Sequence, residues 1–213
     1  MPTAPLPKRA LVVFARAPEL GGVKTRLARE IGEAAALQAY RELGTAVLGA
    51  VGRLGDCDLV VAYTPADREG PVRAWLGPAP AYEPQREGDL GARMLGAIAG
   101  RFAAGAAKVL VIGTDCPDLD PELLEAAFAQ LDRSDAVLGP AADGGYYLVG
   151  MKRPIPEVFQ RIPWSTPATL SATLARAAAA GVSVALLEER RDIDTAADWR
   201  AWRAAQGGAS APG

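Results

Sequence analysis

The chain has 213 residues, half of them apolar, with 23 basic and 25 acidic side chains and no histidine. This length fits one domain with a large core. The nearly balanced charge excludes a nucleic-acid surface or a polybasic membrane patch, and no apolar run reaches the roughly 18 residues that span a bilayer. The lack of histidine excludes Ser-His-Asp and Cys-His catalysis and His-ligated zinc. Proton transfer must therefore use carboxylates, Lys, Tyr, Cys or substrate phosphate.

The two cysteines and the first residues of the chain bear on its compartment. Cys57 and Cys116 are far apart, outside any metal-binding spacing, and the first nine residues hold no apolar signal-peptide segment. We expect a cytoplasmic protein without a membrane span. Its parts would be an N-terminal extension at 1–9, one domain at 10–204 and a disordered tail at 205–213.

Strand-like apolar runs alternate with helical patterns along the chain. This alternation predicts an α/β fold with a mostly parallel mixed sheet and helices on both faces. Strands are expected at residues 10–15, 58–63, 108–112, 135–138, 146–149 and 182–187. The strand at 146–149 follows a glycine-rich turn, so it would lie in a hairpin or at a sheet edge. The proline-rich stretch 154–167 cannot form a continuous helix.

Asp115 follows the run 108–112, whose four consecutive branched apolar residues suit a strand covered on both faces. The carboxylate then lies just past the carboxyl end of the strand, where open α/β sheets bind ligands. An oxygen ligand there suits a hard divalent cation and phosphate-bearing substrates. The alternative is a turn residue that bonds its own backbone. Asp120 before Pro121 is typical of a helix N-cap, and the role of Asp118 stays open.

A basic, glycine-containing segment at 14–26 follows the first strand and opens the first helix. Its glycines let the backbone approach a ligand, while Arg16, Lys24 and Arg26 supply three positive charges. A nucleotide di- or triphosphate needs this combination near a helix N-terminus; the alternative is a solvated basic loop. A Walker loop is excluded, because other residues stand where its glycines should be.

The segment 85–94 joins an expected strand end to the next helix. Gly88 permits a tight turn there, and Gln85 and Arg93 could recognise a base, a ribose or a phosphate. Many helix starts have a similar composition, so these residues alone also fit an ordinary helix cap.

Two further segments could form the side of the site that receives the acceptor. Segment 139–147 carries Asp143 with two glycines and two tyrosines, which fits a polar lip or, equally, a hairpin turn with core tyrosines. Trp164 and Ser165 could form a wall of the acceptor site or merely precede a helix.

The last candidate segment precedes the terminal helix. Asp192 or Asp194 could complete a metal site, although Asp194 or Thr195 could equally cap that helix. Trp199 and Trp202 on the helix could cover the sheet or a partner, so a homodimer is an alternative to a monomer.

These segments in this order resemble the GT-A superfamily of nucleotide-diphospho-sugar transferases, over about 11–199. The nearest resemblance is to a bacterial family of small, glycosyltransferase-like proteins known mainly as a domain of unknown function. The superfamily also includes the molybdenum-cofactor and phospholactate guanylyltransferases. The matching motifs are Ala-Arg-Ala-Pro at 15–18, Lys-Thr-Arg-Leu at 24–27, Gly-Asp-Leu-Gly at 88–91, Gly-Thr-Asp-Cys-Pro at 113–117, Asp-Gly-Gly-Tyr-Tyr at 143–147 and Asp-Ile-Asp-Thr at 192–195.

The resemblance implies a single GT-A, Rossmann-like domain that uses Mg²⁺ or Mn²⁺, a nucleotide or nucleotide-sugar, and a small-molecule acceptor. The implied catalytic residues are Asp115, Asp143 and Lys24. The implied nucleotide-binding residues are Ala15, Arg16, Lys24, Arg26, Gln85, Gly88, Arg93 and Thr114. The implied substrate-binding residues are Gly144, Gly145, Tyr146, Trp164 and Ser165. The implied metal ligands are Asp115, Asp118, Asp192 and Asp194.

Three functions fit these residues. The first is glycosyl transfer from a nucleotide-diphospho-sugar, with Asp143 as the base. The second is guanylyltransferase-like nucleotidyl transfer to a phosphorylated acceptor, with release of pyrophosphate. The third is a nucleotide-binding module without turnover. We favour the first, because the loop at 15–18 has Arg-Ala-Pro where nucleotidyltransferases carry a glycine-rich pattern.

Overall fold

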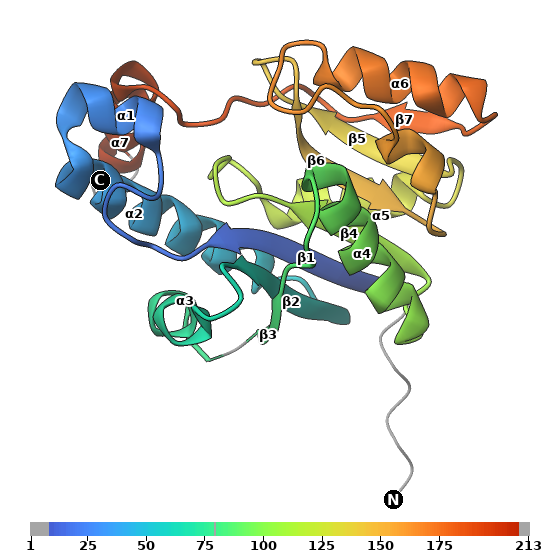
Figure 1. The fold of residues 1–213 in the computed structure, drawn as a ribbon, viewed down its shortest axis with the longest axis horizontal. Helices are drawn as coiled ribbons and strands as arrows, with labels where there is room; N and C mark the ends of the chain where they lie inside the picture. Colours follow the sequence, from blue (N-terminus) through green and yellow to red (C-terminus); the bar gives the residue numbers. More distant parts are fainter. Residues whose placement is uncertain (1–8, 79, 209–213) are drawn as a thin grey trace, which may run out of the picture.

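The computed structural model describes residues 9–78 and 80–208. It contains one seven-stranded sheet (Figure 1). In sheet order the strands are β3 (Ala81–Pro84), β2 (Cys57–Thr64), β1 (Arg9–Arg16), β4 (Lys108–Ile112), β6 (Tyr146–Met151), β5 (Ala136–Pro140) and β7 (Val184–Leu186). All neighbours pair in parallel except β6, which is antiparallel to both β4 and β5. The predicted mixed, mostly parallel sheet is confirmed.

Helices cover both faces of this sheet, as the alternation of strand side chains requires. On β1, Leu11 and Val13 face a core shared with α2, α3 and α5, whereas Ala10 and Val12 face a core shared with α4 and α6. The helices are α1 (Thr25–Ile31), α2 (Glu33–Val51), α3 (Glu69–Leu76), α4 (Leu90–Ala103), α5 (Pro121–Gln130), α6 (Thr169–Ala179) and α7 (Ala196–Gly208). None of the helices in the described ranges is long and apolar enough to cross a membrane.

The last helix, α7, packs against α1 and α2 beside the amino-terminal half of the sheet (Figure 1). Its Trp199 and Trp202 stack with ring centroids 5.3 Å apart, and Trp202 is buried with Leu43 of α2. These tryptophans therefore cover neighbouring helices rather than the sheet. The helix extends to Gly208, into the segment 205–213 that was expected to be a tail. Of the expected N-terminal extension at 1–9, Arg9 is the first residue of β1. Residues 1–8 and 209–213 lie outside the described residues.

The strand at 146–149 was expected in a hairpin or at an edge, and the hairpin is confirmed: β6 pairs with β5 in antiparallel and lies inside the sheet. The short strand β3 was not assigned a range from the sequence, because its four residues are mostly exposed and include a proline. The proline-rich stretch holds only a single 3₁₀ turn at Pro156–Phe159, which confirms that it is not a continuous helix.

The strand directions decide which segments meet. The carboxyl ends of the parallel strands β1, β2 and β4 lie at one edge of the sheet, and the antiparallel strand β6 begins at that same edge. The basic loop after β1, the carboxylate after β4 and the turn before β6 therefore converge there.

Candidate functional site

A cleft of about 710 Å³ opens at this edge. Two groups of side chains line it. The group called the charged wall here consists of Arg16, Lys24, Arg26, Asp115, Asp192 and Asp194. The group called the aromatic wall consists of Leu90, Met94, Tyr146, Trp164, Ser165 and Thr169. Asp143 also lines the cleft and belongs to neither group.

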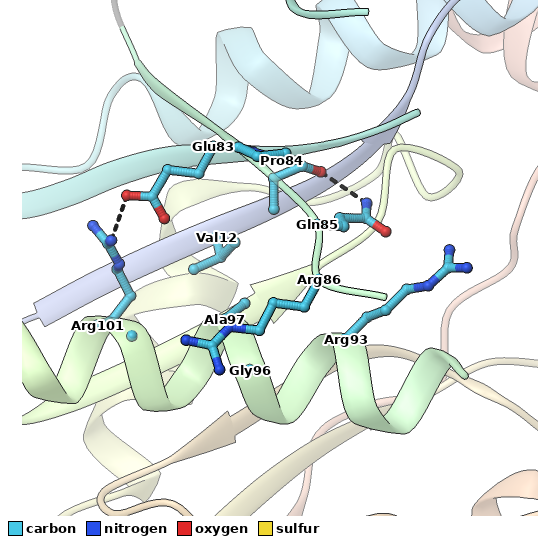
Figure 2. Close-up of a pocket in the computed structure, with 11 residues that line it drawn as sticks. Val12, Glu83, Pro84, Gln85, Arg86, Arg93, Gly96, Ala97 and Arg101 are labelled. Carbon is cyan, nitrogen blue, oxygen red and sulfur yellow. Dashed lines mark hydrogen bonds and ion pairs between the residues drawn. The ribbon is translucent and has the colours of Figure 1, made fainter. Parts of the chain in front are cut away.

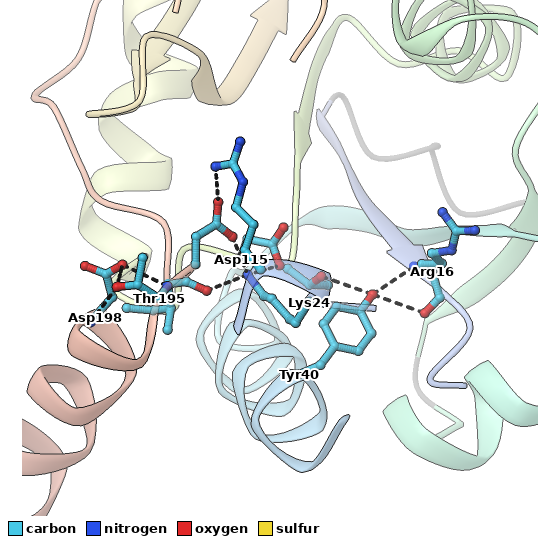
Figure 3. Close-up of polar contacts among 10 residues, drawn as sticks. Arg16, Lys24, Tyr40, Asp115, Thr195 and Asp198 are labelled. Carbon is cyan, nitrogen blue, oxygen red and sulfur yellow. Dashed lines mark hydrogen bonds and ion pairs between the residues drawn. The ribbon is translucent and has the colours of Figure 1, made fainter. Parts of the chain in front are cut away.

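Lys24 is the centre of the charged wall (Figure 3). Its side chain is only 4% exposed, and its ammonium lies 2.8 Å from Asp115 Oδ1 and 3.2 Å from Asp194 Oδ1. It also donates a hydrogen bond of 2.7 Å to the carbonyl oxygen of Ile193. Three oxygen atoms, from segments before α5 and before α7, thus surround one buried cation. Two of these contacts, to Ile193 and Asp194, are hydrogen bonds, and the contact with Asp115 is an ion pair. Together they offset the cost of burying the charge.

The loop that delivers Lys24 is held by unusual local geometry. Lys24 itself has a left-handed backbone, with φ 47° and ψ 47°, and it precedes the first residue of α1 without a side-chain cap. A non-glycine residue rarely adopts this conformation, which costs on the order of 1 kcal/mol or more. Buried Val23 and Leu27 on either side anchor the segment. The ion pairs and this packing together hold Lys24 in a strained position that points into the cleft.

Tyr40 of α2 fixes the position of the neighbouring Arg16. The Tyr40 hydroxyl accepts a hydrogen bond of 2.9 Å from the backbone amide of Arg16 and donates one of 3.1 Å to the backbone carbonyl of Arg16. It also lies 3.4 Å from the hydroxyl of Thr114. Burial raises the pKa of Tyr40 to about 12, so the phenol stays protonated. Tyr40 is not among the site residues expected from the sequence, because helical periodicity carries no information about the partner of a hydroxyl.

The segment before α7 closes the charged wall. The Ile193 amide donates to the Asp115 carbonyl over 2.9 Å, which ties this segment to the loop after β4. Thr195, not Asp194, caps α7: its hydroxyl accepts from the Asp198 amide, and the Asp198 carboxylate accepts from the Thr195 amide. Asp194 is therefore free to pair with Lys24 and, at 3.6 Å, with Arg26.

The pKa of Asp192 shows how close the carboxylates of this wall lie to one another. Burial, followed by the charges of Asp115, Asp143 and Asp194, raises the pKa of Asp192 to about 7, although Lys24 opposes the shift. The three carboxylates of the charged wall thus lie around one buried ammonium, and Asp143 adds a further negative charge from outside the wall. Carboxylate oxygens are the donors that Mg²⁺ and Mn²⁺ prefer, and a bound cation would relieve this repulsion. Within 9–78 and 80–208, no three acidic or cysteine side chains are already arranged around one point as a metal site.

The aromatic wall has a different construction. Tyr146 and Trp164 meet edge to face with centroids 6.4 Å apart, and Phe159 packs behind Trp164 at the same separation. Leu90 at the start of α4 is 42% exposed beside them. Gly91 leaves room for the indole, because a Cβ there would lie 2.5 Å from Trp164 Cζ2. The wall thus presents apolar ring surface to the cleft.

The turn that carries Asp143 is held against this wall. Gly144 has φ 88°, and a Cβ on it would lie 2.3 Å from the carbonyl oxygen of Pro167. Its own carbonyl accepts a bond of 2.9 Å from the Leu170 amide. The Gly145 amide donates to Asp143 Oδ1 over 2.8 Å. These contacts fix the exposed carboxylate of Asp143. Its negative charge helps to raise the pKa of Asp192, so Asp143 lies near the junction of the two walls.

Most residues suggested from the sequence do line the cleft. They are Ala15, Arg16, Lys24, Arg26, Gln85, Thr114, Asp115, Asp143, Gly145, Tyr146, Trp164, Ser165, Asp192 and Asp194. Gln85 is partly committed elsewhere, because its amide donates to the Ala62 carbonyl over 2.8 Å. The cleft also includes Phe14, Leu90 and Met94, which the sequence analysis did not single out as site residues because apolar side chains on strands and helices look like core.

Four suggested residues do not line it: Gly88, Arg93, Asp118 and Gly144. Asp118 is exposed outside the cleft, and Gly144 shapes the turn before β6. Arg93 donates to the Gly88 carbonyl over 2.9 Å. Arg93 borders a separate pocket of about 80 Å³ under β3, together with Arg86 (Figure 2).

Comparisons with known proteins place these features in context. Residues 47–166 match the family described as "Uncharacterized protein conserved in bacteria (DUF2064)". The chain is 34% identical to a "putative nucleotide-diphospho-sugar transferase" from Desulfovibrio desulfuricans G20, with a TM-score of 0.88 over 95% of this chain and 89% of that one. No curated protein sequence matches the chain.

More distant structures share the fold alone. The CTP complex of CMP:2-keto-3-deoxy-manno-octonic acid synthetase has 14% identity and a TM-score of 0.61, covering 94% of this chain and 99% of that one. The manganese complex of Rv0371C from Mycobacterium tuberculosis H37Rv has 18% identity and a TM-score of 0.57, covering 91% and 96%. The GT-A-like architecture inferred from the sequence is thereby confirmed.

Proposed function

The chain belongs to the bacterial DUF2064 family, and we propose that it is a metal-dependent glycosyltransferase whose donor is a nucleotide-diphospho-sugar. One observation carries this proposal: basic side chains from the segment that runs from the end of β1 into α1 and carboxylates from two distant segments converge in one cleft at the carboxyl edge of the sheet. This edge is where open α/β sheets bind nucleotides. The relative from Desulfovibrio desulfuricans, a "putative nucleotide-diphospho-sugar transferase", supports the choice of donor.

The three basic residues of the charged wall have different roles in this proposal. Arg16 forms no ion pair within the described part of the chain, and Arg26 is 69% exposed, so both guanidinium groups are available to bind the diphosphate. Lys24 is enclosed by its three oxygen partners. In this proposal Lys24 neutralises and positions Asp115 and Asp194. Its ammonium can contact a phosphate group only after one of these three contacts is broken.

The carboxylates of the charged wall fit a hard divalent cation. Asp115 and Asp192 would hold Mg²⁺ or Mn²⁺, with Asp194 as a further candidate. A cation bound there supplies charge neutralisation for the departing nucleoside diphosphate. The manganese complex of a protein with the same fold supports the choice of cation.

The reaction then takes place at the junction of the walls. An acceptor hydroxyl bonds to the anomeric carbon of the donor while the bond from that carbon to the diphosphate oxygen breaks. The electron pair of this bond leaves with the nucleoside diphosphate. The hydroxyl proton passes to the carboxylate of Asp143, whose place at the junction is fixed by the turn before β6.

Product analysis tests this function. Purified protein is incubated with nucleotide-diphospho-sugars and Mn²⁺, and the nucleotide product is separated by ion-exchange chromatography. We expect release of nucleoside diphosphate. Nucleotidyl transfer, which the shared fold of the CTP-bound synthetase favours as the second candidate, would instead consume a nucleoside triphosphate and release pyrophosphate. Pyrophosphate as the product would reject glycosyl transfer. Absence of turnover with intact nucleotide binding would favour a non-catalytic module.

A further inference from the structure

The basic side chains of the cleft all belong to one short segment. Among the described residues that line it, they are Arg16 at the end of β1, Lys24 in the loop that follows, and Arg26 in the first turn of α1. Lys24 is already paired with two carboxylates. The positive charge available to a ligand is therefore concentrated on the side that the proposed donor occupies.

The opposite side of the cleft offers a ligand no positive charge. The described residues of the aromatic wall are apolar or neutral, and the nearest ionisable group at the junction is the carboxylate of Asp143. Tyr146 adds no charge either, because burial raises the pKa of its phenol well above the usual value. A phosphate group entering here would find a like charge and no cation to pair with.

The wall does offer ring surface and a fixed shape. Trp164 and Tyr146 stand edge to face, Trp164 is backed by Phe159, and Leu90 is exposed beside them. Such surface binds the apolar face of a sugar ring or an aromatic ring and gains little from a strongly hydrated phosphate. The close fits of Gly91 and Gly144 hold the wall in this shape before any ligand binds.

We infer that the acceptor is an uncharged hydroxyl compound whose apolar face packs on Trp164 and Tyr146, and that the enzyme discriminates against phosphorylated acceptors. The inference rests on the proposed function, which requires an acceptor on this side of the cleft. It adds the chemical class of that acceptor and names Trp164 as the residue that recognises it.

A matched pair of probes tests the inference. p-Nitrophenyl β-D-glucoside and its 6-phosphate differ by one phosphate group, and saturation-transfer NMR measures the binding of each to the full-length protein with Mn²⁺ and a nucleoside diphosphate present. We expect the neutral glucoside to bind about tenfold or more tightly than its phosphate, and Trp164→Ala to weaken its binding by about tenfold. Trp164→Phe should retain most of the affinity because it keeps an apolar ring.

A second pair of variants tests the charge argument without removing the ring. Leu90 is exposed, so neither Leu90→Lys nor Leu90→Gln should unfold the protein. We expect Leu90→Lys to tighten binding of the 6-phosphate by about threefold or more while Leu90→Gln does not, because only the lysine supplies the missing cation.

Three results would overturn the inference: equal or tighter binding of the 6-phosphate to the unaltered protein, no binding of the neutral glucoside, or no effect of Trp164→Ala. Binding of the nucleoside diphosphate is measured in the same samples. If this binding persists and still depends on Asp115, the failure concerns the acceptor class alone. If it is absent, the proposed donor function fails as well.

Discussion

The charged wall and the aromatic wall meet in one cleft but obtain their geometry in different ways. In the charged wall, Lys24 contacts Asp194 across 170 positions of sequence, and both are positioned by ion pairs and by backbone bonds to the Ile193 segment. In the aromatic wall, glycines 91 and 144 create the space into which Trp164 and Pro167 fit. The comparison shows that electrostatic pairing organises the charged wall, while steric fit organises the aromatic wall.

The largest effect on activity should follow from breaking the charged wall at Asp115. The carboxamide of Asp115→Asn keeps the size of the side chain but removes the charge that Lys24 and a divalent cation require. We expect turnover to fall by about 10²-fold or more, as when a group that stabilises developing charge is removed. The release of nucleoside diphosphate measures this loss. Asp118→Asn is the matched control, because Asp118 lies exposed outside the cleft; an equal loss in that variant would contradict the assignment.

The next effect concerns stability. Lys24→Met leaves Asp115 and Asp194 without their shared cation and the Ile193 carbonyl without its donor. We expect a loss of about 2 kcal/mol or more, which lowers the Tm of a chain of this size by about 4–8 °C. Thermal unfolding monitored by circular dichroism gives the value.

Arg26→Met is the control for this loss, because its guanidinium is 69% exposed and lies 3.6 Å from Asp194. Such an exposed pair contributes at most about 1 kcal/mol. If the two variants unfold at the same temperature, Lys24 does not organise the wall.

The steric side of the comparison is tested at Gly144. In Gly144→Ala the new Cβ would overlap the Pro167 backbone at a residue with φ 88°, so we expect a loss of about 2 kcal/mol or more. Gly181→Ala has a similar positive φ of 65° but nothing within 4 Å of its Cβ, so it should cost only about 1 kcal/mol. Urea unfolding measures both variants. Equal losses would mean that backbone strain alone, and not the fit of the wall, determines the effect.

The smallest effect is the pH dependence caused by Asp192. Its pKa is raised to about 7 in the folded protein, so between pH 4 and 7 the folded state holds a proton that the unfolded state releases. The free energy of unfolding of the metal-free protein therefore decreases as the pH rises through this window. Asp192→Asn should therefore raise the Tm at pH 8 and change it little at pH 4. A Tm difference that is the same at both pH values would show that Asp192 is not protonated in the folded state.

Much of the fold follows from the sequence because burial leaves a periodic signal. The run at 108–112 and the cap at Asp120 predict β4 and the start of α5 correctly. The candidate residues also converge largely as expected, since strand order brings the ends of β1 and β4 together.

The partners of these residues could not be inferred in the same way. Lys24 is enclosed by Asp115, Asp194 and the carbonyl of Ile193. This arrangement depends on how α7 packs, and no local sequence pattern predicts that packing. The hydroxyl contacts of Tyr40 likewise depend on tertiary packing. The alternation of apolar residues specifies which side chains are buried, but not which polar atoms they meet.

The central claim is that the charged wall binds a nucleotide donor together with a divalent cation held by Asp115. Isothermal titration of a nucleoside diphosphate into the protein, with Mn²⁺ and with a chelator, tests it most directly. We predict binding that requires Mn²⁺ in the unaltered protein, is lost in Asp115→Asn and persists in Asp118→Asn. Binding that is unchanged by the chelator and by Asp115→Asn would contradict the account.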